Sequence, residues 1–133
     1  MQELIIDNSF WSIFPQAKIY TLVVSGINNH ITDKSGKYQI MLNQAEEEAK
    51  QYLTAKDFKD NTVVAEWRDV LTKFKKKKGA RASIEALLKR VSQGKTFDPI
   101  NPLVDIYNSV SLEYAVPCGG EDLDQIAGQM HLA

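Results

Sequence analysis

Three polar residues in the last third of the sequence have a spacing that could carry chemistry. Asn101, Asp105 and Asn108 fall at i, i+4 and i+7, which places them on one side of a helix. Val104 and Leu112 lie beside them, and the opposite side is apolar: Leu103, Ile106, Tyr107, Val110 and Tyr114. We expect a helix that is apolar on two sides to be buried, where an unpaired polar group costs about 1–3 kcal/mol. Asp105 and Asn108 therefore belong either to a buried network that ties down neighbouring loops or to a pocket wall.

A short segment with two glycines and several acids follows, Pro-Cys-Gly-Gly-Glu-Asp-Leu-Asp at residues 117–124. Gly119 and Gly120 allow a tight backbone whose free N–H groups could hold an oxyanion or a terminal hydroxyl. Glu121 and Asp122 would repel a phosphate dianion, so a cationic group such as an α-ammonium suits this segment better. The alternative is a structural turn whose acids complement the dipole of a helical turn.

Cysteine and histidine are too few for the usual nucleophilic or metal chemistry. Cys118, His30 and His131 are scattered, with neither the arrangement of a catalytic triad nor the spacing of a metal site. A lone cysteine is more often a small buried apolar residue than a nucleophile. The sequence therefore predicts no metal and no cofactor, and it identifies no catalytic residue.

Charge is distributed unevenly along a chain whose net charge is only −1. Residues 1–72 carry a net charge of −3, residues 73–95 a net charge of +8, and residues 96–133 a net charge of −6. The basic stretch is densest at Lys75, Lys76, Lys77, Lys78 and Arg81. It is either the solvated end of a helix or a contact for a phosphate backbone. Only Phe74 is aromatic there, so stacking of bases is not indicated.

A chain of 133 residues, 44% hydrophobic and 25% charged, has the size and composition of one folded domain. Its longest nearly apolar run, residues 19–27, is shorter than the roughly 20 residues of a membrane helix. The start, MQELIIDNSF, lacks the basic and apolar regions of a signal peptide. A single cysteine excludes an internal disulfide and favours a reducing compartment. We therefore expect one cytoplasmic domain over residues 1–133, with no membrane partner.

The elements that position these residues predict an α+β fold, with β segments first, then about four helices and a short final strand. The β segments are expected at residues 5–6, 11–14 and 18–27, and the strand at residues 129–132. Apolar periodicity and capping residues predict helices over residues 38–53, 62–74, 83–94 and 102–114, with Asn61, Ser83 and Asn101 as N-caps. The final strand either pairs with the N-terminal strands or begins the rest of a larger domain.

Residues 100–132 resemble the editing module of the bacterial phenylalanyl-tRNA synthetase beta chain. That module has an N-x-x-V-D-[IV]-x-N helix, a G-x-P turn and a D-L-D segment that closes on a glycine. The matching positions are Asn101, residues 104–106, Asn108, Pro117, residues 122–124 and Gly128. Residues 66–95 are similar to free-standing relatives of the module. Two positions differ from the synthetase: Gly119 stands where it usually has histidine, and Ala115 where it usually has glycine.

The resemblance implies the N-terminal part of an α+β editing domain that hydrolyses the ester of mischarged tRNA in trans. The amino-acid pocket would include Asn101, Asp105, Asn108, Gly119, Gly120, Glu121 and Asp122, and the RNA contact would include Lys75, Lys76, Lys77, Lys78 and Arg81. The expected partner is tRNA or aminoacyl-tRNA rather than DNA. Two alternatives remain: a non-catalytic RNA-binding or scaffold domain of the same fold, and a binder of free amino acids.

Overall fold

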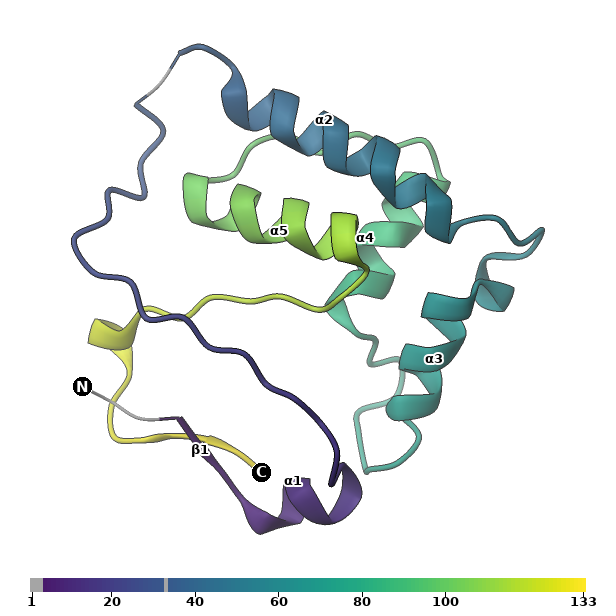
Figure 1. The fold of residues 1–133 in the computed structure, drawn as a ribbon, viewed down its shortest axis with the longest axis vertical. Helices are drawn as coiled ribbons and strands as arrows, with labels where there is room; N and C mark the ends of the chain where they lie inside the picture. Colours follow the sequence, from purple (N-terminus) through teal and green to yellow (C-terminus); the bar gives the residue numbers. More distant parts are fainter. Residues whose placement is uncertain (1–3, 33) are drawn as a thin grey trace. The chain divides into compact units, whose positions relative to one another are not determined.

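The computed structural model describes residues 4–32 and 34–133, which form two compact units. The larger unit spans residues 28–120 and holds the four long helices (Figure 1). The smaller unit combines the N-terminal segment up to Ile27 with residues from Glu121 to the C-terminus. The structure is mixed α and β, as the sequence predicts. None of the described helices is long and apolar enough to cross a membrane.

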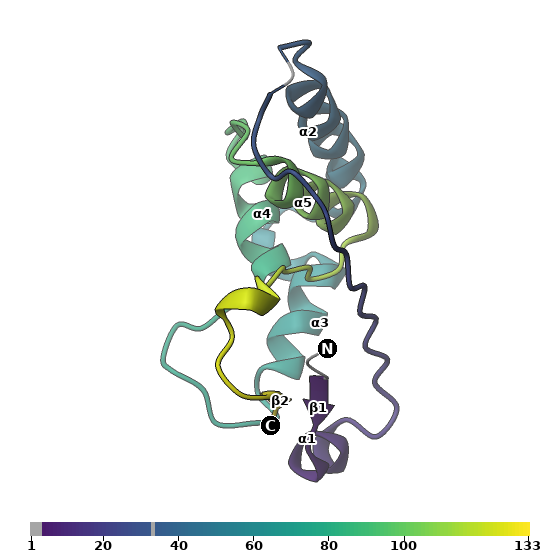
Figure 2. The same cartoon turned by 90° about the vertical axis from the view of Figure 1, so that its left-hand side faces the viewer.

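The larger unit is built from four α-helices, α2 (Lys37–Ala49), α3 (Thr62–Val70), α4 (Ser83–Ser92) and α5 (Pro102–Tyr114). Short 3-10 turns at Lys50–Tyr52 and Phe58–Asp60 lie between α2 and α3. Helices α2 and α5 lie side by side, with α4 against both (Figure 2). The core comes from every helix and one loop: Leu42, Ala45, Ala49, Val64, Ile84, Leu88, Val91, Phe97 and Leu112. The four predicted helices are thus confirmed, although the second ends at Val70 rather than at Phe74.

The ends of α4 and α5 show how far local sequence fixes a helix. The side chain of Asn101 accepts the N–H of Val104 at 2.9 Å, and Pro102 is the first helical residue, as predicted. Ser83 does not cap α4: it is the first helical residue, and Ala82 holds the cap position without a side-chain hydrogen bond. Gly94 follows α4 with a φ of +69°, a conformation that favours glycine.

The smaller unit contains a two-stranded parallel sheet. Strand β1 (Leu4–Ile6) pairs with β2 (Met130–Leu132), with Ile5 opposite His131. The N–H of Asp7 donates to the carbonyl of Leu132 at 2.9 Å, which extends the pairing by one bond. The predicted final strand therefore does pair with an N-terminal strand.

Two predicted β segments are wrong. Residues 11–14 belong mostly to helix α1 (Asn8–Ile13), where the ring of Phe10 packs edge-on against Trp11 with centroids 5.3 Å apart. Residues 18–27 form no strand. Their β-branched and aromatic residues fit a pleated, half-buried surface, but β-propensity acts only where a neighbouring strand supplies that surface. No part of the described chain pairs with this segment.

Candidate functional site

The polar row of α5 is anchored to the loop that precedes it. The carboxylate of Asp105 is 1% exposed, and its Oδ1 accepts the N–H of Ile100 at 2.8 Å. The hydroxyl of Ser109 donates to the backbone carbonyl of Asp105 at 2.7 Å. The other carboxylate oxygen, Oδ2, is buried and has no hydrogen-bond donor among the described residues. Half of this carboxylate therefore has a structural partner and half has none.

Helix α2 holds the same loop from its other side. The Gln39 side chain donates to the carbonyl of Phe97 at 2.9 Å, and a carboxylate oxygen of Glu46 accepts the Phe97 N–H at 2.8 Å. With the Asp105 bond to Ile100, these contacts form a polar network. Such a network was one of the two roles that the sequence predicts for Asp105 and Asn108. Asn108 is half-buried one turn beyond Asp105. Because Oδ2 is closed off, a ligand could reach it only after the residues that cover it had moved.

The prediction that α5 is buried on both apolar sides is wrong for one of them. Leu112 and Ser111 are fully buried against the core, but four residues of the predicted apolar side are exposed: Leu103, Ile106, Val110 and Tyr114. Helices α2 and α4 pack against α5, and apolar periodicity does not reveal how many neighbours a helix has.

Gly120, which follows α5 in the sequence, lies against the surface of that helix. A Cβ at Gly120 would lie 3.3 Å from Cε1 of Tyr107 and 3.5 Å from Cδ2 of Leu103, so glycine permits this close approach. A Cβ at Gly119 would meet nothing within 4 Å. Neither glycine has a positive φ. Before them, the half-buried Cys118 thiol donates weakly to the Val116 carbonyl at 3.8 Å, and burial raises the pKa of Cys118.

The acidic residues after the glycines form a local turn in the smaller unit. Both Glu121 and Asp122 are exposed. The side chain of Asp122 accepts the N–H of Asp124 at 3.0 Å and caps a 3-10 turn at Leu123–Gln125. The predicted pocket residues are thus divided: Asn101, Asp105, Asn108, Gly119 and Gly120 belong to the larger unit, and Glu121 and Asp122 to the smaller one.

The lysine run lies in a loop rather than at a helix end, because α3 stops at Val70 and α4 begins at Ser83. We call residues 73–81 the basic loop. All four of Lys75, Lys76, Lys77 and Lys78 are exposed. Within the described chain, no carboxylate lies at ion-pair distance from any of these four ammonium groups. Their charge is therefore available to a partner.

One buried carboxylate, on helix α4, contacts both helix α3 and the C-terminal end of the basic loop. Glu85 is 6% exposed and accepts from Arg68 through two guanidinium nitrogens, Nε at 3.2 Å and an Nη at 2.7 Å. Arg81 reaches the same carboxylate with its Nε at 3.4 Å. The hydrogen bond to Glu85 raises the pKa of Arg68 above its ordinary value. Arg81 is thus partly neutralised, unlike the four lysines that it was grouped with.

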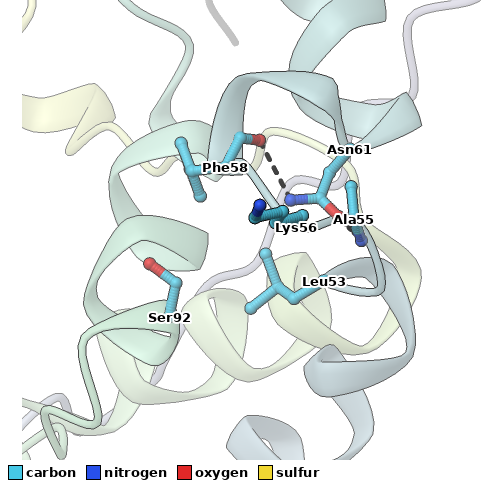
Figure 3. Close-up of a pocket in the computed structure, with 6 residues that line it drawn as sticks. All are labelled: Leu53, Ala55, Lys56, Phe58, Asn61 and Ser92. Atoms are coloured by element: carbon cyan, nitrogen blue, oxygen red, sulfur yellow. Dashed lines mark hydrogen bonds between the residues drawn. The ribbon is translucent and has the colours of Figure 1, made fainter.

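A pocket of about 290 Å³ lies elsewhere in the larger unit, lined by Leu53, Ala55, Lys56, Phe58, Asn61 and Ser92 (Figure 3). Asn61, predicted only as a helix cap, shapes it: its amide donates to the Phe58 carbonyl and accepts the Ala55 N–H, both at 2.9 Å. Lys89 stands over the Phe58 ring, 4.5 Å from its centroid. The sequence did not indicate this pocket, because an asparagine that shapes a pocket and one that only caps a helix both stand directly before the helix.

A second pocket, of about 160 Å³, is lined by Glu46, Glu47, Lys50, Val91, Gly94, Lys95 and Thr96. Neither pocket includes a residue predicted to bind substrate, and neither is lined by a histidine or a cysteine. Among the described residues there is also no cluster of three or more histidine, cysteine, aspartate or glutamate side chains that could hold a metal ion. Among the described residues, the four exposed lysines of the basic loop, Lys75 to Lys78, are therefore the feature best suited to binding a partner.

Comparison with known proteins gives one match. The model of the B3/4 domain family matches residues 66–133, just over half of the chain, from α3 through the basic loop and α5 to β2. No curated protein and no solved structure matches. The chain therefore belongs to the B3/4 domain family, a domain found in phenylalanyl-tRNA synthetase beta chains.

Proposed function

We propose that this protein is a cytoplasmic aminoacyl-tRNA editing-type protein that hydrolyses the ester of mischarged tRNA in trans. The observation that carries the proposal is the match to the B3/4 domain over residues 66–133, because that stretch contains α5, the acidic turn and the basic loop. The occurrence of this domain in a tRNA synthetase chain supports an aminoacyl-tRNA as the substrate.

The amino-acid end of the substrate would meet the residues around α5 and the acidic turn. Asn101, Asp105 and Asn108 would form one side of its pocket, and Glu121 or Asp122 would hold its α-ammonium. The N–H groups of Gly119 and Gly120 would face the oxyanion that forms when water attacks the ester carbonyl. The bond to the ribose oxygen then breaks, and that oxygen takes a proton from the attacking water to become a hydroxyl, so that a positioned water and preorganised donors suffice.

The RNA would meet the basic loop. Lys75, Lys76, Lys77 and Lys78 are exposed and free of carboxylates in the described structure, so binding phosphates would break no ion pair of theirs. Arg81 would contribute less, because Glu85 already occupies it at 3.4 Å. Four phosphate contacts would give a slope of about −3 for the logarithm of the binding constant against that of the salt concentration.

A deacylation panel tests the enzymatic half of the proposal. Mischarged tRNAs, tyrosyl-tRNA of the phenylalanine type among them, are incubated with the chain, and ester loss is followed against the uncatalysed rate. Glu121→Gln is expected to lower the rate at least about tenfold, as loss of a charge-assisted bond does, and the exposed Glu113→Gln is the matched control. A folded chain that leaves every ester at its uncatalysed rate would refute the hydrolase.

A non-catalytic tRNA-binding or scaffold domain of the same fold is the second candidate. It is favoured by the closed position of Asp105 Oδ2, and by the two pockets, because none of the predicted substrate residues lines either of them. This candidate predicts steeply salt-dependent tRNA binding without ester hydrolysis.

Charge reversal tests the RNA contact that both candidates share. Lys75, Lys76, Lys77 and Lys78 are changed together to glutamate, and the matched control changes four exposed lysines elsewhere: Lys18, Lys34, Lys56 and Lys59. Both variants have the same net charge. Filter binding is expected to show at least a hundredfold weaker tRNA affinity and a flattened salt slope for the first variant only. Equal losses in the two variants would sink the specific role of the basic loop.

A further inference from the structure

The basic loop contains a tight turn near its C-terminal end. The N–H of Ala80 donates to the carbonyl of Lys77 at 3.1 Å, and Gly79 has a φ of +81°. A turn of four residues with a positive φ at its third position favours a residue that tolerates the left-handed region, usually glycine. A Cβ at Gly79 would meet nothing within 4 Å, so the backbone conformation, and not a lack of space, is what favours glycine there.

The N-terminal end of the loop is also hydrogen-bonded. Directly after α3, the N–H of Lys73 donates to the carbonyl of Val70 at 3.2 Å. Lys75 and Lys76 therefore lie between two hydrogen-bonded turns, and residues 77 and 78 belong to the second turn. Consecutive exposed ammonium groups repel one another, and the two turns limit how far the loop can spread in response.

An ion pair holds the chain directly after the second turn. Arg81 reaches the carboxylate of Glu85 with its Nε at 3.4 Å, and Arg68 of α3 donates to the same carboxylate at 2.7 Å. Glu85 is only 6% exposed, so this attachment point is buried. The C-terminal end of the basic loop is therefore fastened to a group that α3 and α4 share.

These contacts bear on binding because a segment that is already ordered loses little freedom when it meets a partner. Fixing a flexible backbone costs conformational entropy, and a mobile loop would bear that cost on binding. A loop held by two turns and an ion pair has its lysines arranged in advance. It can then meet several phosphates of one nucleic-acid backbone at the same time.

We propose that Gly79 and Glu85 are positioning residues for the RNA contact. Gly79 acts through the turn and Glu85 acts through Arg81, and together they hold the lysines at residues 75–78 in the arrangement that meets phosphates. Neither Gly79 nor Glu85 supplies a positive charge of its own. The inference rests on the proposed function, because it requires that the basic loop binds tRNA.

Substitution of Gly79 tests the turn without a change of charge. Gly79→Val places a β-branched residue where φ is positive, which disfavours the turn, whereas Gly79→Asn supplies a residue that tolerates this conformation. Filter binding is expected to show about three- to tenfold weaker tRNA affinity for Gly79→Val. The salt slope of this variant should also be shallower, because fewer phosphates are met at once. Gly79→Asn should bind within about twofold of the wild type.

Gly36→Val is the matched control. Gly36 has a φ of +77°, and a Cβ there would also meet nothing within 4 Å, so valine introduces the same kind of backbone strain at the start of α2. This variant should bind tRNA as the wild type does. Wild-type affinity for Gly79→Val, or an equal loss of affinity in Gly79→Asn or Gly36→Val, overturns the role of the turn.

The sign of a charge effect tests Glu85. Glu85→Gln removes one negative charge, which by electrostatics alone should strengthen binding to a polyanion. As a positioning residue, Glu85 predicts the opposite: about threefold weaker tRNA binding for Glu85→Gln. The exposed Glu66→Gln on α3 makes the same change of charge and should bind at least as tightly as the wild type. Tighter binding by both variants overturns the role of Glu85.

Circular dichroism verifies the fold of each variant, and the exposed Gly79 decides the proposal if Glu85→Gln does not fold. A wild-type chain without measurable tRNA affinity refutes the RNA contact and the positioning roles together. If charge reversal of residues 75–78 abolishes tRNA binding while Gly79→Val and Glu85→Gln leave it unchanged, the RNA contact stands and the positioning roles are refuted.

Discussion

Two buried carboxylates of the larger unit, Glu85 and Asp105, differ in their hydrogen-bond and ion-pair partners. Glu85 accepts hydrogen bonds from two nitrogens of Arg68 and has Arg81 at 3.4 Å. Asp105 is more deeply buried, yet only one of its oxygens is bonded, and its donor is the uncharged N–H of Ile100. No arginine or lysine in the described chain forms an ion pair with it.

The two carboxylates differ in how completely their hydrogen bonds and charge are compensated. Removing a carboxylate from water is costly unless charges and hydrogen bonds replace the lost solvent. For Glu85 this replacement is present, because Arg68 of α3 and Arg81 of the basic loop both reach it. For Asp105 the replacement is half present. Among the described residues, Glu85 is therefore compensated by charged partners, whereas Asp105 has one neutral donor on one oxygen.

The largest effect in this comparison is expected from Arg68→Ala. The variant leaves Glu85 buried with Arg81 as its remaining partner, and breaking a buried pair from one side costs about 3–5 kcal/mol. Because Arg68 is itself partly exposed, we expect the low end, about 3 kcal/mol of unfolding free energy in urea denaturation. Lys73→Ala, which removes an exposed contact to Asp69 at 3.9 Å, is the control and should cost less than about 0.5 kcal/mol. Similar losses in both variants would contradict the anchoring role of Glu85.

A smaller effect is expected at Asp105. Asp105→Ala leaves the Ile100 N–H without an acceptor and should lower the unfolding free energy by about 2 kcal/mol. Asp105→Asn retains an oxygen for that N–H and removes a buried charge, so its stability should stay within about 1 kcal/mol of the wild type. Deacylation by Asp105→Asn then separates the roles. Activity lost at near-native stability assigns Oδ2 to the substrate, and activity that follows stability in both variants assigns Asp105 to the network alone.

The helices could be predicted because their signals are local. Apolar periodicity gave α2 to α5, and the Asn101 cap lies three residues from the N–H that it accepts. The segment over residues 18–27 was predicted as a strand from the same kind of local pattern, but a strand requires a neighbour that no local pattern contains. Helix α1 was missed because six residues with a cluster of aromatic rings have no clear period.

The site could be predicted only in part for a related reason. Burial of Asp105 followed from the two-sided pattern of α5, and the structure confirms it. The direction of its carboxylate depends on the loop before α5, which Gln39 and Glu46 hold from more than 50 residues away. The Arg68–Glu85 pair spans 17 residues and two helices, so no helical spacing could have indicated it.

The smallest effect is expected on the reactivity of Cys118. This thiol is half-buried, and the only cause of its raised pKa is desolvation, so it extends the comparison to a group without a charged partner. Burial alone raises the pKa of its thiol, because desolvation disfavours the thiolate. The thiolate is the reactive form, so alkylation by iodoacetamide near pH 8 should be a few-fold slower in the folded chain than in the chain unfolded by urea, and its pH profile should lie above the usual midpoint of about 8.5. The sign for stability follows: the folded state prefers the neutral thiol, so this contribution is complete below the unfolded pKa and is lost as the pH rises through the folded one. Identical alkylation profiles for the folded and unfolded chains would show that the thiol is as well solvated as an ordinary cysteine.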